Sequence, residues 1–415
     1  MSKKKNKFIP ELRFPEFKNE GEWEAKTLGE VAERIEEKVN DKKLITASIS
    51  AGTGFVSQAE KFSRDISGAQ YKNYIVLNEG EFSYNKGNSK RFPQGCIYKL
   101  KEFKQVAVPN AFISFRFKQD FIGDFYQGYF DKNYHGIQLM RFITSGARMD
   151  GLLNIKADDF FNIVLPTPSK SEQQKIASCL SSLDEVIEAH SQKLELLKDH
   201  KKGLMQNLFP QEGEKVPKFR FKEFKNSGNW IDKKLNEICE VNPPSKSLPE
   251  KFVYIDLESV EDGILKQKKH ITISEAPSRA QRLLKKADVI FQTVRPYQQN
   301  NYYFLPDDSF KYVASTGYAQ LRAYESSSFL YQYVHNPNFL GKVLAKCTGS
   351  NYPAINSSDL SEITVLIPSK IQEQQKIASC LSALDEIITA QAEILEQLKL
   401  HKKGLMQLLL PKTID

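Results

Sequence analysis

The 415-residue sequence lacks long apolar runs and closely spaced cysteines. No stretch approaches the roughly 18 consecutive apolar residues of a membrane-spanning helix, and no apolar segment follows the basic residues 1–7. We therefore expect neither a membrane span nor a secretory signal. The cysteines are odd in number and never spaced as Cys-x-x-Cys, which argues against a zinc site and a disulfide framework: Cys96, Cys179, Cys239, Cys347 and Cys380. A reducing cytoplasm fits this usage best.

The familiar signatures of catalysis are missing as well: no phosphate-binding loop GxxxxGK[ST], no HExxH and no GxSxG is present. Residues 242–245, Asn-Pro-Pro-Ser, approach the Asn/Asp-Pro-Pro-aromatic motif of adenine methyltransferases, but serine stands where a ring would stack on the flipped base. Asp307 and Asp308 would suit a metal nuclease, yet an acidic-x-Lys partner is lacking. We expect a proline-rich turn at 242–245, and no catalytic residue, metal site or cofactor in this chain.

Two segments of the chain repeat almost letter for letter. Residues 172–210 and 373–411 are identical at 28 of 39 positions, beginning with Glu-Gln-Gln-Lys-Ile-Ala-Ser-Cys-Leu-Ser. A second repeat joins residues 10–19 to residues 217–226 and precedes the only two tryptophans, Trp23 and Trp230. These tryptophans are expected to pack where each domain begins. The chain is thus a tandem duplication.

Between the repeated segments the two copies differ. Residues 40–140 and 245–345 barely align, apart from a weak likeness of 155–166 to 355–368. A duplicated enzyme would be expected to keep one catalytic constellation in each copy, whereas a recognition protein would keep its scaffold and vary its binding surfaces. The pattern favours recognition.

Each repeated segment has the periodicity of a long amphipathic helix. Apolar residues alternate at steps of three and four over more than four heptads, and two such helices can bury each other. Ser169 with Glu172, and Ser369 with Gln372, predict capping boxes, while Pro210 and Pro411 end the runs. His190, Gln391, Lys201 and Lys402 are polar seam positions expected to fix the register. The predicted seam is Ile176, Leu180, Leu183, Ile187, Leu194, Leu197, Ile377, Leu381, Leu384, Ile388, Leu395 and Leu398.

These features predict an α+β fold. Two globular α/β domains lie in tandem, each followed by a long helix, and the helices pair as an antiparallel coiled coil with pseudo-two-fold symmetry. The predicted limits are residues 1–166 for the first domain, 167–212 for the central helix, 213–367 for the second domain and 368–415 for the C-terminal helix.

Loops rich in basic and amide residues are the candidate binding surfaces. One follows residues 81–84 and another follows residues 288–292, with weaker candidates at 145–148 and 348–352. Arginine and lysine bind guanine edges or phosphates, and asparagine and glutamine pair with adenine. An ordinary exposed turn is the alternative, because such turns use the same residues. The net charge of +8 agrees with a polyanionic partner without proving one. The candidate DNA contacts are Lys86, Asn88, Lys90, Arg91, Arg148, Arg295, Tyr297, Gln298, Asn300 and Asn351.

The sequence resembles the specificity subunit of type I restriction–modification enzymes. The resemblance is carried by the run at 168–177 that ends in Gln-Gln-Lys-Ile-Ala, its copy at 368–378, the Leu-x-x-Leu-Asp-Glu continuation and the Lys-Gly-Leu-Met-Gln helix end. It implies two target-recognition domains that each read half of a bipartite DNA site, with the helices acting as spacer and docking surface for two methyltransferase subunits. Those subunits would bring S-adenosylmethionine, and a separate restriction (translocase) subunit would use ATP and Mg²⁺.

Two other functions remain open at this point. A coiled-coil scaffold would use the same helices and loops to bind protein rather than DNA. A self-contained methyltransferase would bind S-adenosylmethionine itself.

Overall fold

The computed structural model describes residues 8–63, 68–87, 92–143, 153–245, 247–349 and 351–411. The chain forms two compact units, one of residues 1–189 with 395–415 and one of residues 190–394. Each unit therefore combines one globular domain with parts of both long helices. Each is described by itself below.

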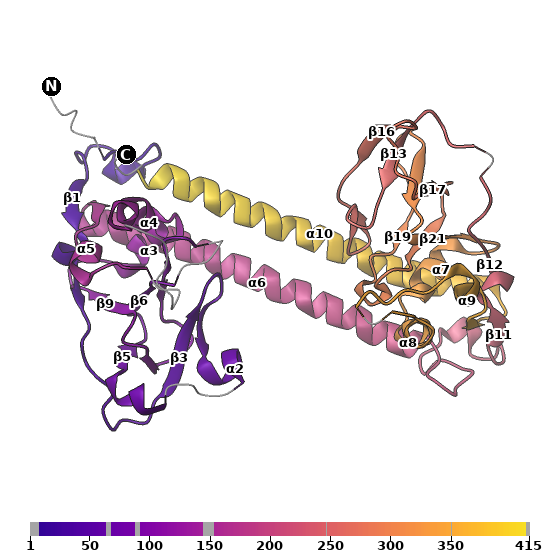
Figure 1. Ribbon diagram of the computed structural model, residues 1–415, viewed down its shortest axis with the longest axis horizontal. Helices are drawn as coiled ribbons and strands as arrows, with labels where there is room; N and C mark the ends of the chain where they lie inside the picture. The colour runs from indigo at the N-terminus through magenta and orange to yellow at the C-terminus, as the bar shows by residue number, and fades with distance from the viewer. Residues whose placement is uncertain are drawn as a thin grey trace. The chain divides into compact units, whose positions relative to one another are not determined.

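The first domain is built on two four-stranded sheets (Figure 1), with strand orders β2-β9-β6-β7 and β4-β3-β8-β5. All neighbours are antiparallel except β3 and β8, and a separate antiparallel pair, β1 with β10, closes the domain. The strands are β1 (Glu24–Thr27), β2 (Ala32–Arg34), β3 (Ile45–Ser50), β4 (Gly54–Ser57), β5 (Ile75–Asn78), β6 (Phe82–Asn85), β7 (Cys96–Lys99), β8 (Gln105–Val108), β9 (Ile113–Phe117) and β10 (Val164–Thr167). The helices are η1 (Pro15–Phe17), α1 (Leu28–Val31), α2 (Gln58–Phe62), η2 (Gly68–Asn73), α3 (Gly123–Asp131), α4 (Tyr134–Leu139), η3 (Met140–Phe142) and α5 (Ala157–Phe161).

The second domain follows the same plan, with sheets β12-β21-β18-β19 and β16-β13-β20-β17 and the pair β11 with β22. The parallel neighbours are again the two central strands, here β13 and β20, and a short hairpin of β14 and β15 is added. Its strands are β11 (Ile231–Lys234), β12 (Cys239–Val241), β13 (Lys251–Ile255), β14 (Val260–Glu261), β15 (Ile264–Leu265), β16 (Lys269–Thr272), β17 (Ala280–Leu283), β18 (Val289–Gln292), β19 (Tyr302–Tyr303), β20 (Tyr312–Ser315), β21 (Tyr318–Ala323) and β22 (Thr364–Ile367). Its helices are η4 (Lys222–Phe224), η5 (Leu235–Glu237), η6 (Pro296–Gln298), α7 (Ser327–Val334), α8 (Pro337–Ala345) and α9 (Ser357–Ser361). The two domain bodies thus share a topology although their sequences barely align.

Two long helices follow the domains, α6 (Lys170–Leu208) and α10 (Ile371–Leu409), each of 39 residues. The apolar heptad positions are buried or partly buried in both helices, as the side chains of Ile176, Leu180, Ile377 and Leu381 illustrate. Among the described residues, no helix combines the length and apolar character that crossing a bilayer requires.

Of the two expected capping boxes, only the hydrogen bond to the Ser169 side chain forms. Ser169 Oγ accepts a hydrogen bond from the backbone N–H of Glu172 at 3.4 Å, but the Glu172 carboxylate turns away from the helix end to bind Arg13. The second helix begins only at Ile371, two residues after Ser369. A repeated glutamate at this position therefore serves the tertiary structure rather than the local helix start.

The repeated glutamates join each domain to its helix. Glu172 accepts two hydrogen bonds from the Arg13 guanidinium, at 2.8 and 2.7 Å, and one from the Trp23 indole at 3.1 Å. Hydrogen bonding to Glu172 raises the pKa of Arg13. In the second unit Glu373 accepts from Arg220 at 2.7 and 2.8 Å and from Trp230 at 3.2 Å. The two separate sequence repeats meet in this contact, called here the Arg–Glu–Trp clamp.

The C-terminal end of each long helix packs into the core of a domain. In the first unit Met406, Leu409 and Leu410 enter the core of the domain, and the N–H of Leu12 donates to the carbonyl of Leu408 at 2.9 Å. In the second unit Met205, Leu208 and Phe209 enter the core in the same way, and the N–H of Phe219 donates to the carbonyl of Asn207 at 2.8 Å. Each domain therefore holds the start of one long helix and the end of the other, which requires the two helices to run antiparallel.

Polar residues pair along the helix seam. In the second unit Lys201 forms an ion pair with Asp385, and the Gln391 amide nitrogen lies 2.9 Å from both Nδ1 and the carbonyl oxygen of His190. In the first unit Lys402 forms the equivalent ion pair with Asp184. The two ion pairs are the same contact in the two copies of the repeat, and His190 and Gln391 occupy the same position of the repeat. Together these contacts fix the antiparallel register.

Candidate nucleic-acid interface

In the second unit the two candidate loops lie together. The loop after β18 contacts the segment before α9 through a bridge between Val294 and Ala354. The N–H of Arg295 donates to the carbonyl of Pro353 at 2.7 Å, and the N–H of Ile355 donates to the carbonyl of Thr293 at 3.0 Å. Residues 293–301, 348–349 and 351–354 therefore form one surface, although more than 40 residues of sequence separate the two loops. We call it the second-unit loop surface.

Gln292, the last residue of β18, organises this loop from below. Its side chain is 1% exposed. The amide nitrogen donates to the carbonyl of Val294 and to Oε1 of Gln298, both at 2.8 Å, and Oε1 accepts from the N–H of Asn300 at 3.1 Å. The backbone of the loop is held by one buried carboxamide.

A second support comes from α7. Asn301 Oδ1 accepts from the N–H of Gln292 at 2.8 Å, and its amide nitrogen lies 3.4 Å from Nε2 of His335. Nδ1 of His335 is 2.8 Å from the carbonyl of Tyr331, so Nδ1 carries the proton and Nε2 accepts. Burial lowers the pKa of His335 to about 4, which keeps the ring neutral and preserves this arrangement near pH 7.

The candidate residues of the second unit differ in what their side chains can still bind. The carboxamide oxygens of Gln298 and Asn300 accept hydrogen bonds from Gln292 and from the N–H of Asp262. Tyr297 and Asn351 are exposed, and the half-buried Arg295 lies with its guanidinium 4.4 Å from the ring centroid of Tyr352. The structure therefore places Arg295, Tyr297, Gln298 and Asn351 on this surface, where Tyr297, Gln298 and Asn351 are exposed and Arg295 is half-buried.

In the first unit the structure places one candidate residue. Lys86 follows β6 and is partly buried, and its carbonyl accepts from the N–H of Leu153 at 2.9 Å. The preceding Asn85 accepts from the N–H of Gly87 at 2.9 Å, so a carboxamide at the strand end supports the loop here as well. The candidates Asn88, Lys90, Arg91 and Arg148 lie outside the described residues.

The residues that sequence reasoning did not single out are Gln292, Asn301 and Tyr352. The first two read as ordinary polar residues of a strand end and a loop. Their roles depend on burial and on contacts across the loop, which no local pattern shows. Tyr352 lay within a candidate loop, but its contact with Arg295 joins two distant segments. The one sequence signal for Tyr352 was that an aromatic residue ends a candidate binding loop.

The residues that suggested catalysis have structural roles. Asn242 adopts a positive φ of 55°, accepts from the N–H of Gln320 at 2.9 Å and donates to Ser357 Oγ at 2.6 Å, so its side chain holds the backbone in place. Asp307 and Asp308 both pair with Lys268. Within the described part of the chain, His, Cys, Asp and Glu side chains form no cluster of three that could hold a metal ion.

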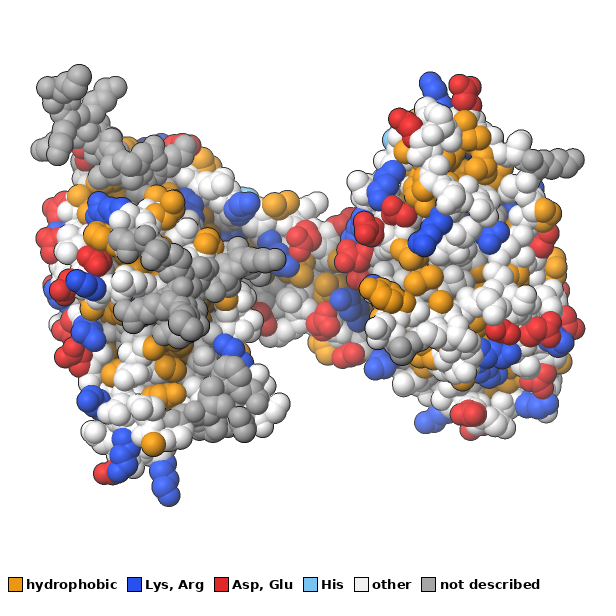
Figure 2. Space-filling view, in the orientation of Figure 1, with side chains coloured by type: hydrophobic (Ala, Val, Ile, Leu, Met, Phe, Trp, Pro, Cys, Tyr) orange, Lys and Arg blue, Asp and Glu red, His pale blue; other side chains and the backbone are white. Residues whose placement is uncertain are grey.

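Charge is mixed on the visible surface. Figure 2 shows basic and acidic side chains interspersed over the second domain rather than gathered into one positive field. Some of these basic side chains are paired locally with acids, as Lys234 is with Glu362 and Lys215 with Asp232. No broad basic surface is therefore visible on this face of the second domain.

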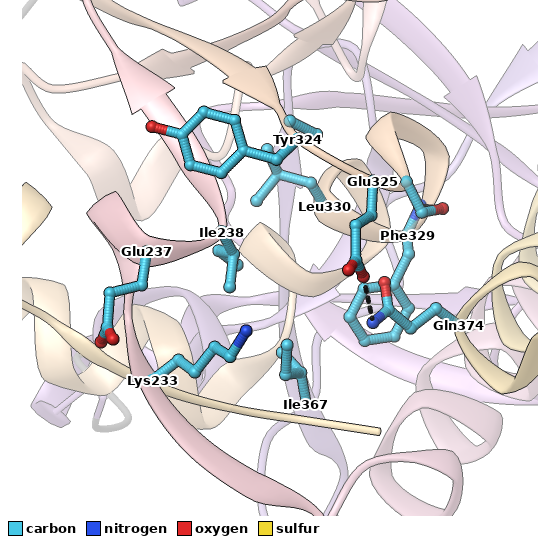
Figure 3. A pocket seen from close by; sticks show the side chains of 11 residues that line it. Lys233, Glu237, Ile238, Tyr324, Glu325, Phe329, Leu330, Ile367 and Gln374 are labelled. Atoms are coloured by element: carbon cyan, nitrogen blue, oxygen red, sulfur yellow. Dashed lines mark hydrogen bonds between the residues drawn. The ribbon is translucent and has the colours of Figure 1, made fainter. Parts of the chain in front are cut away.

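A small cavity of about 50 Å³ lies at the base of the second domain. Figure 3 shows apolar side chains such as Ile238, Leu330 and Ile367 in it, and a hydrogen bond of 3.3 Å from Gln374 to Glu325 at its edge. In the first domain aromatic rings occupy the equivalent place. Phe117 and Tyr126 stack there with ring centroids 4.6 Å apart. The cavity thus marks where the second copy has smaller residues, and it is too small for a nucleotide cofactor.

Comparisons with known proteins agree with this architecture. The family model described as "Type I restriction modification DNA specificity domain" matches residues 20–199 and 227–400. The chain is 24% identical over 294 residues to the type I restriction enzyme MjaVIII specificity subunit of Methanocaldococcus jannaschii, covering 66% of this chain and 67% of that protein. It is 25% identical over 271 residues to the putative type I restriction enzyme MjaX specificity subunit of the same organism, covering 61% of this chain and 60% of that protein.

Solved structures show the same fold. The S subunit of the type I restriction–modification system from M. genitalium matches with a TM-score of 0.59 and 16% identity, over 98% of this chain and 100% of that one. A chain from a structural study of complex assembly in the type I R-M system matches with a TM-score of 0.51 and 16% identity, over 92% and 96%.

Proposed function

Because this chain belongs to the type I restriction–modification DNA specificity family, we propose that its two domains each read one half of a bipartite, asymmetric DNA site. The family is that of the non-catalytic specificity subunit, so sequence recognition and not chemistry is its task. We propose residues 1–166 and 213–367 as the recognition domains, and 167–212 and 368–415 as helical spacers.

One observation supports this division most directly. The Arg–Glu–Trp clamp and the helix ends are the same in both units, whereas the loops that follow β6 and β18 differ in sequence. A protein with the same scaffold contacts in both units and different loops on each domain is suited to reading two different DNA sequences. A protein-binding scaffold would explain the helices but not the DNA specificity family to which both domains belong.

The remaining chemistry is assigned to partners. Two methyltransferase subunits dock on the paired helices and bring S-adenosylmethionine, with which they methylate adenine N6. A separate restriction (translocase) subunit uses ATP and Mg²⁺ to cut unmethylated DNA. The assembly works on cellular DNA in the cytoplasm.

Mapping methylated adenines tests the proposal. The chain is expressed with its methyltransferase subunits in a host without adenine methylation of its own, and the methylated positions are sequenced. We expect one asymmetric motif with two specified parts and an unspecified gap. Methylation without a bipartite motif, or binding by the purified complex that is equal for all duplexes and insensitive to salt, would contradict it.

A further inference from the structure

Arg295 in the second-unit loop surface has an unusual environment. Its guanidinium lies 4.4 Å from the ring centroid of Tyr352, whose side chain is 63% exposed. Among the described residues no carboxylate pairs with it, whereas the guanidinium groups of Arg220 and Arg322 bind Glu373 and Asp288. The Arg295 guanidinium therefore contacts the face of an aromatic ring, and its N–H groups form no ion pair with a described carboxylate.

The backbone that carries Arg295 is fixed in advance. Arg295 has a left-handed conformation with φ of 53°, which residues other than glycine adopt only when their surroundings impose it. Those surroundings are the hydrogen bond from its N–H to Pro353 and the Gln292 network that holds the rest of the loop. Strained backbone conformations of this kind cluster at binding and active sites.

The position of the guanidinium over the ring bears on which hydrogen bonds it can offer. When a ring covers one face of the planar group, its edge still presents parallel N–H donors in one plane. In DNA, the O6 and N7 atoms of guanine accept such a pair, and this is the commonest specific contact to a base. A phosphate also accepts arginine, but it requires neither a fixed plane nor an aromatic support.

We propose that Arg295, supported by Tyr352, reads a guanine in the half-site of the second domain. This inference rests on the proposed function, because it assigns one base to a surface proposed to bind DNA. Gln292 acts as a positioning residue, because it contacts the loop and not the base. Gln298 and Asn300 shape the loop through the hydrogen bonds that their carboxamide oxygens accept.

The test uses the assembled complex with its methyltransferase subunits, prepared with the wild-type chain and with R295A, R295K and Y352L. Binding is measured on duplexes in which each base pair of the second half-site is changed in turn, at two salt concentrations. We expect R295A and R295K to reduce the preference for guanine at one position by about tenfold or more. Y352L should reduce it less, and the first half-site should be read as before.

The control is R279A, which removes an exposed arginine of the same domain and should leave every base preference unchanged. If R295A weakens all duplexes equally and lowers the salt slope by about one unit, Arg295 binds phosphate and the inference is wrong. Unchanged binding in R295A also overturns it. A wild-type complex that shows no preference anywhere in the second half-site contradicts the proposed function instead.

Discussion

At the scale of single residues, the Arg–Glu–Trp clamp is the contact on which each unit most depends. Glu373 is 1% exposed, and removing the charge of one partner leaves Arg220 buried without a counter-ion. We expect Glu373→Gln to lower the free energy of unfolding by about 3 kcal/mol, because breaking a buried pair costs roughly 3–5 kcal/mol and the amide keeps part of the hydrogen bonding. Urea denaturation of the full chain measures this.

Glu386→Gln is the matched control, since Glu386 lies on the exposed side of the same helix. It should change the unfolding free energy by less than about 0.5 kcal/mol. Equal effects of the two variants would show that the clamp does not stabilise the second unit.

Two histidines, the buried His135 and the partly buried His335, predict the response to acid. Burial lowers the pKa of His135 and of His335 to about 4. Since the unfolded value is about 6.5, neither ring affects stability well above pH 6.5, and each destabilises the fold as the pH falls from 6.5 toward 4, because only the unfolded state then binds the proton. At pH 5.5 each should cost about 1 kcal/mol relative to pH 7.

Urea denaturation at both pH values measures the loss. His135→Gln should remove about half of the acid sensitivity, whereas His200→Gln, at an exposed position on α6, should leave it unchanged. If His135→Gln showed the full wild-type loss, that ring would not be the group that titrates.

At the scale of elements, strand β21 has room for a larger side chain. Ala323 lines the cavity of about 50 Å³, and in the first domain Phe117 holds the equivalent place opposite Ala32, as Ala323 lies opposite Cys239. Ala323→Val should stabilise the second unit by about 1 kcal/mol, because filling a cavity recovers about 24 cal/mol for each Å³. The thermal midpoint of the full chain measures it.

Ala319→Val tests the same change at a packed site. Ala319 lies four residues earlier on β21, is fully buried and lines no described cavity. Overpacking there should destabilise the protein by about 1–3 kcal/mol. Stabilisation by both variants would mean that valine's preference for strands, and not the cavity, is responsible.

The paired helices also act as elements with a set register. Lys201→Asp should destabilise the second unit by placing two acids together at Asp385. Adding Asp385→Lys should restore most of the loss, with a coupling of about 1 kcal/mol in a double-mutant cycle. Independent, additive effects would show that this pair does not set the register.

At the scale of the whole molecule, the proposed function separates domain from helix. Replacing residues 1–165 by the first domain of another family member should change one half of the methylated motif and leave the other half unchanged. Lengthening both helices by one heptad should change the gap between the halves and neither half itself. Methylome sequencing measures both. A domain replacement that altered both halves would contradict independent reading.

The sequence by itself determined the duplicated plan. Helix periodicity depends only on the spacing of residues such as Ile176 and Leu180, so a local pattern was sufficient to predict both long helices. The absence of catalytic motifs likewise needs no structure. The two equivalent tryptophans were correctly expected to pack where each domain begins.

Only the tertiary structure decided what the repeated glutamates and the candidate loops do. Glu172 was expected to cap its own helix, but its partner Arg13 is 159 residues away, and a contact over that distance leaves no local signature. For the same reason the sequence could nominate Arg295 and Gln298 equally. The fold separates them by their contacts, because the carboxamide oxygen of Gln298 accepts a hydrogen bond from the buried Gln292, whereas the guanidinium of Arg295 lies over the ring of Tyr352.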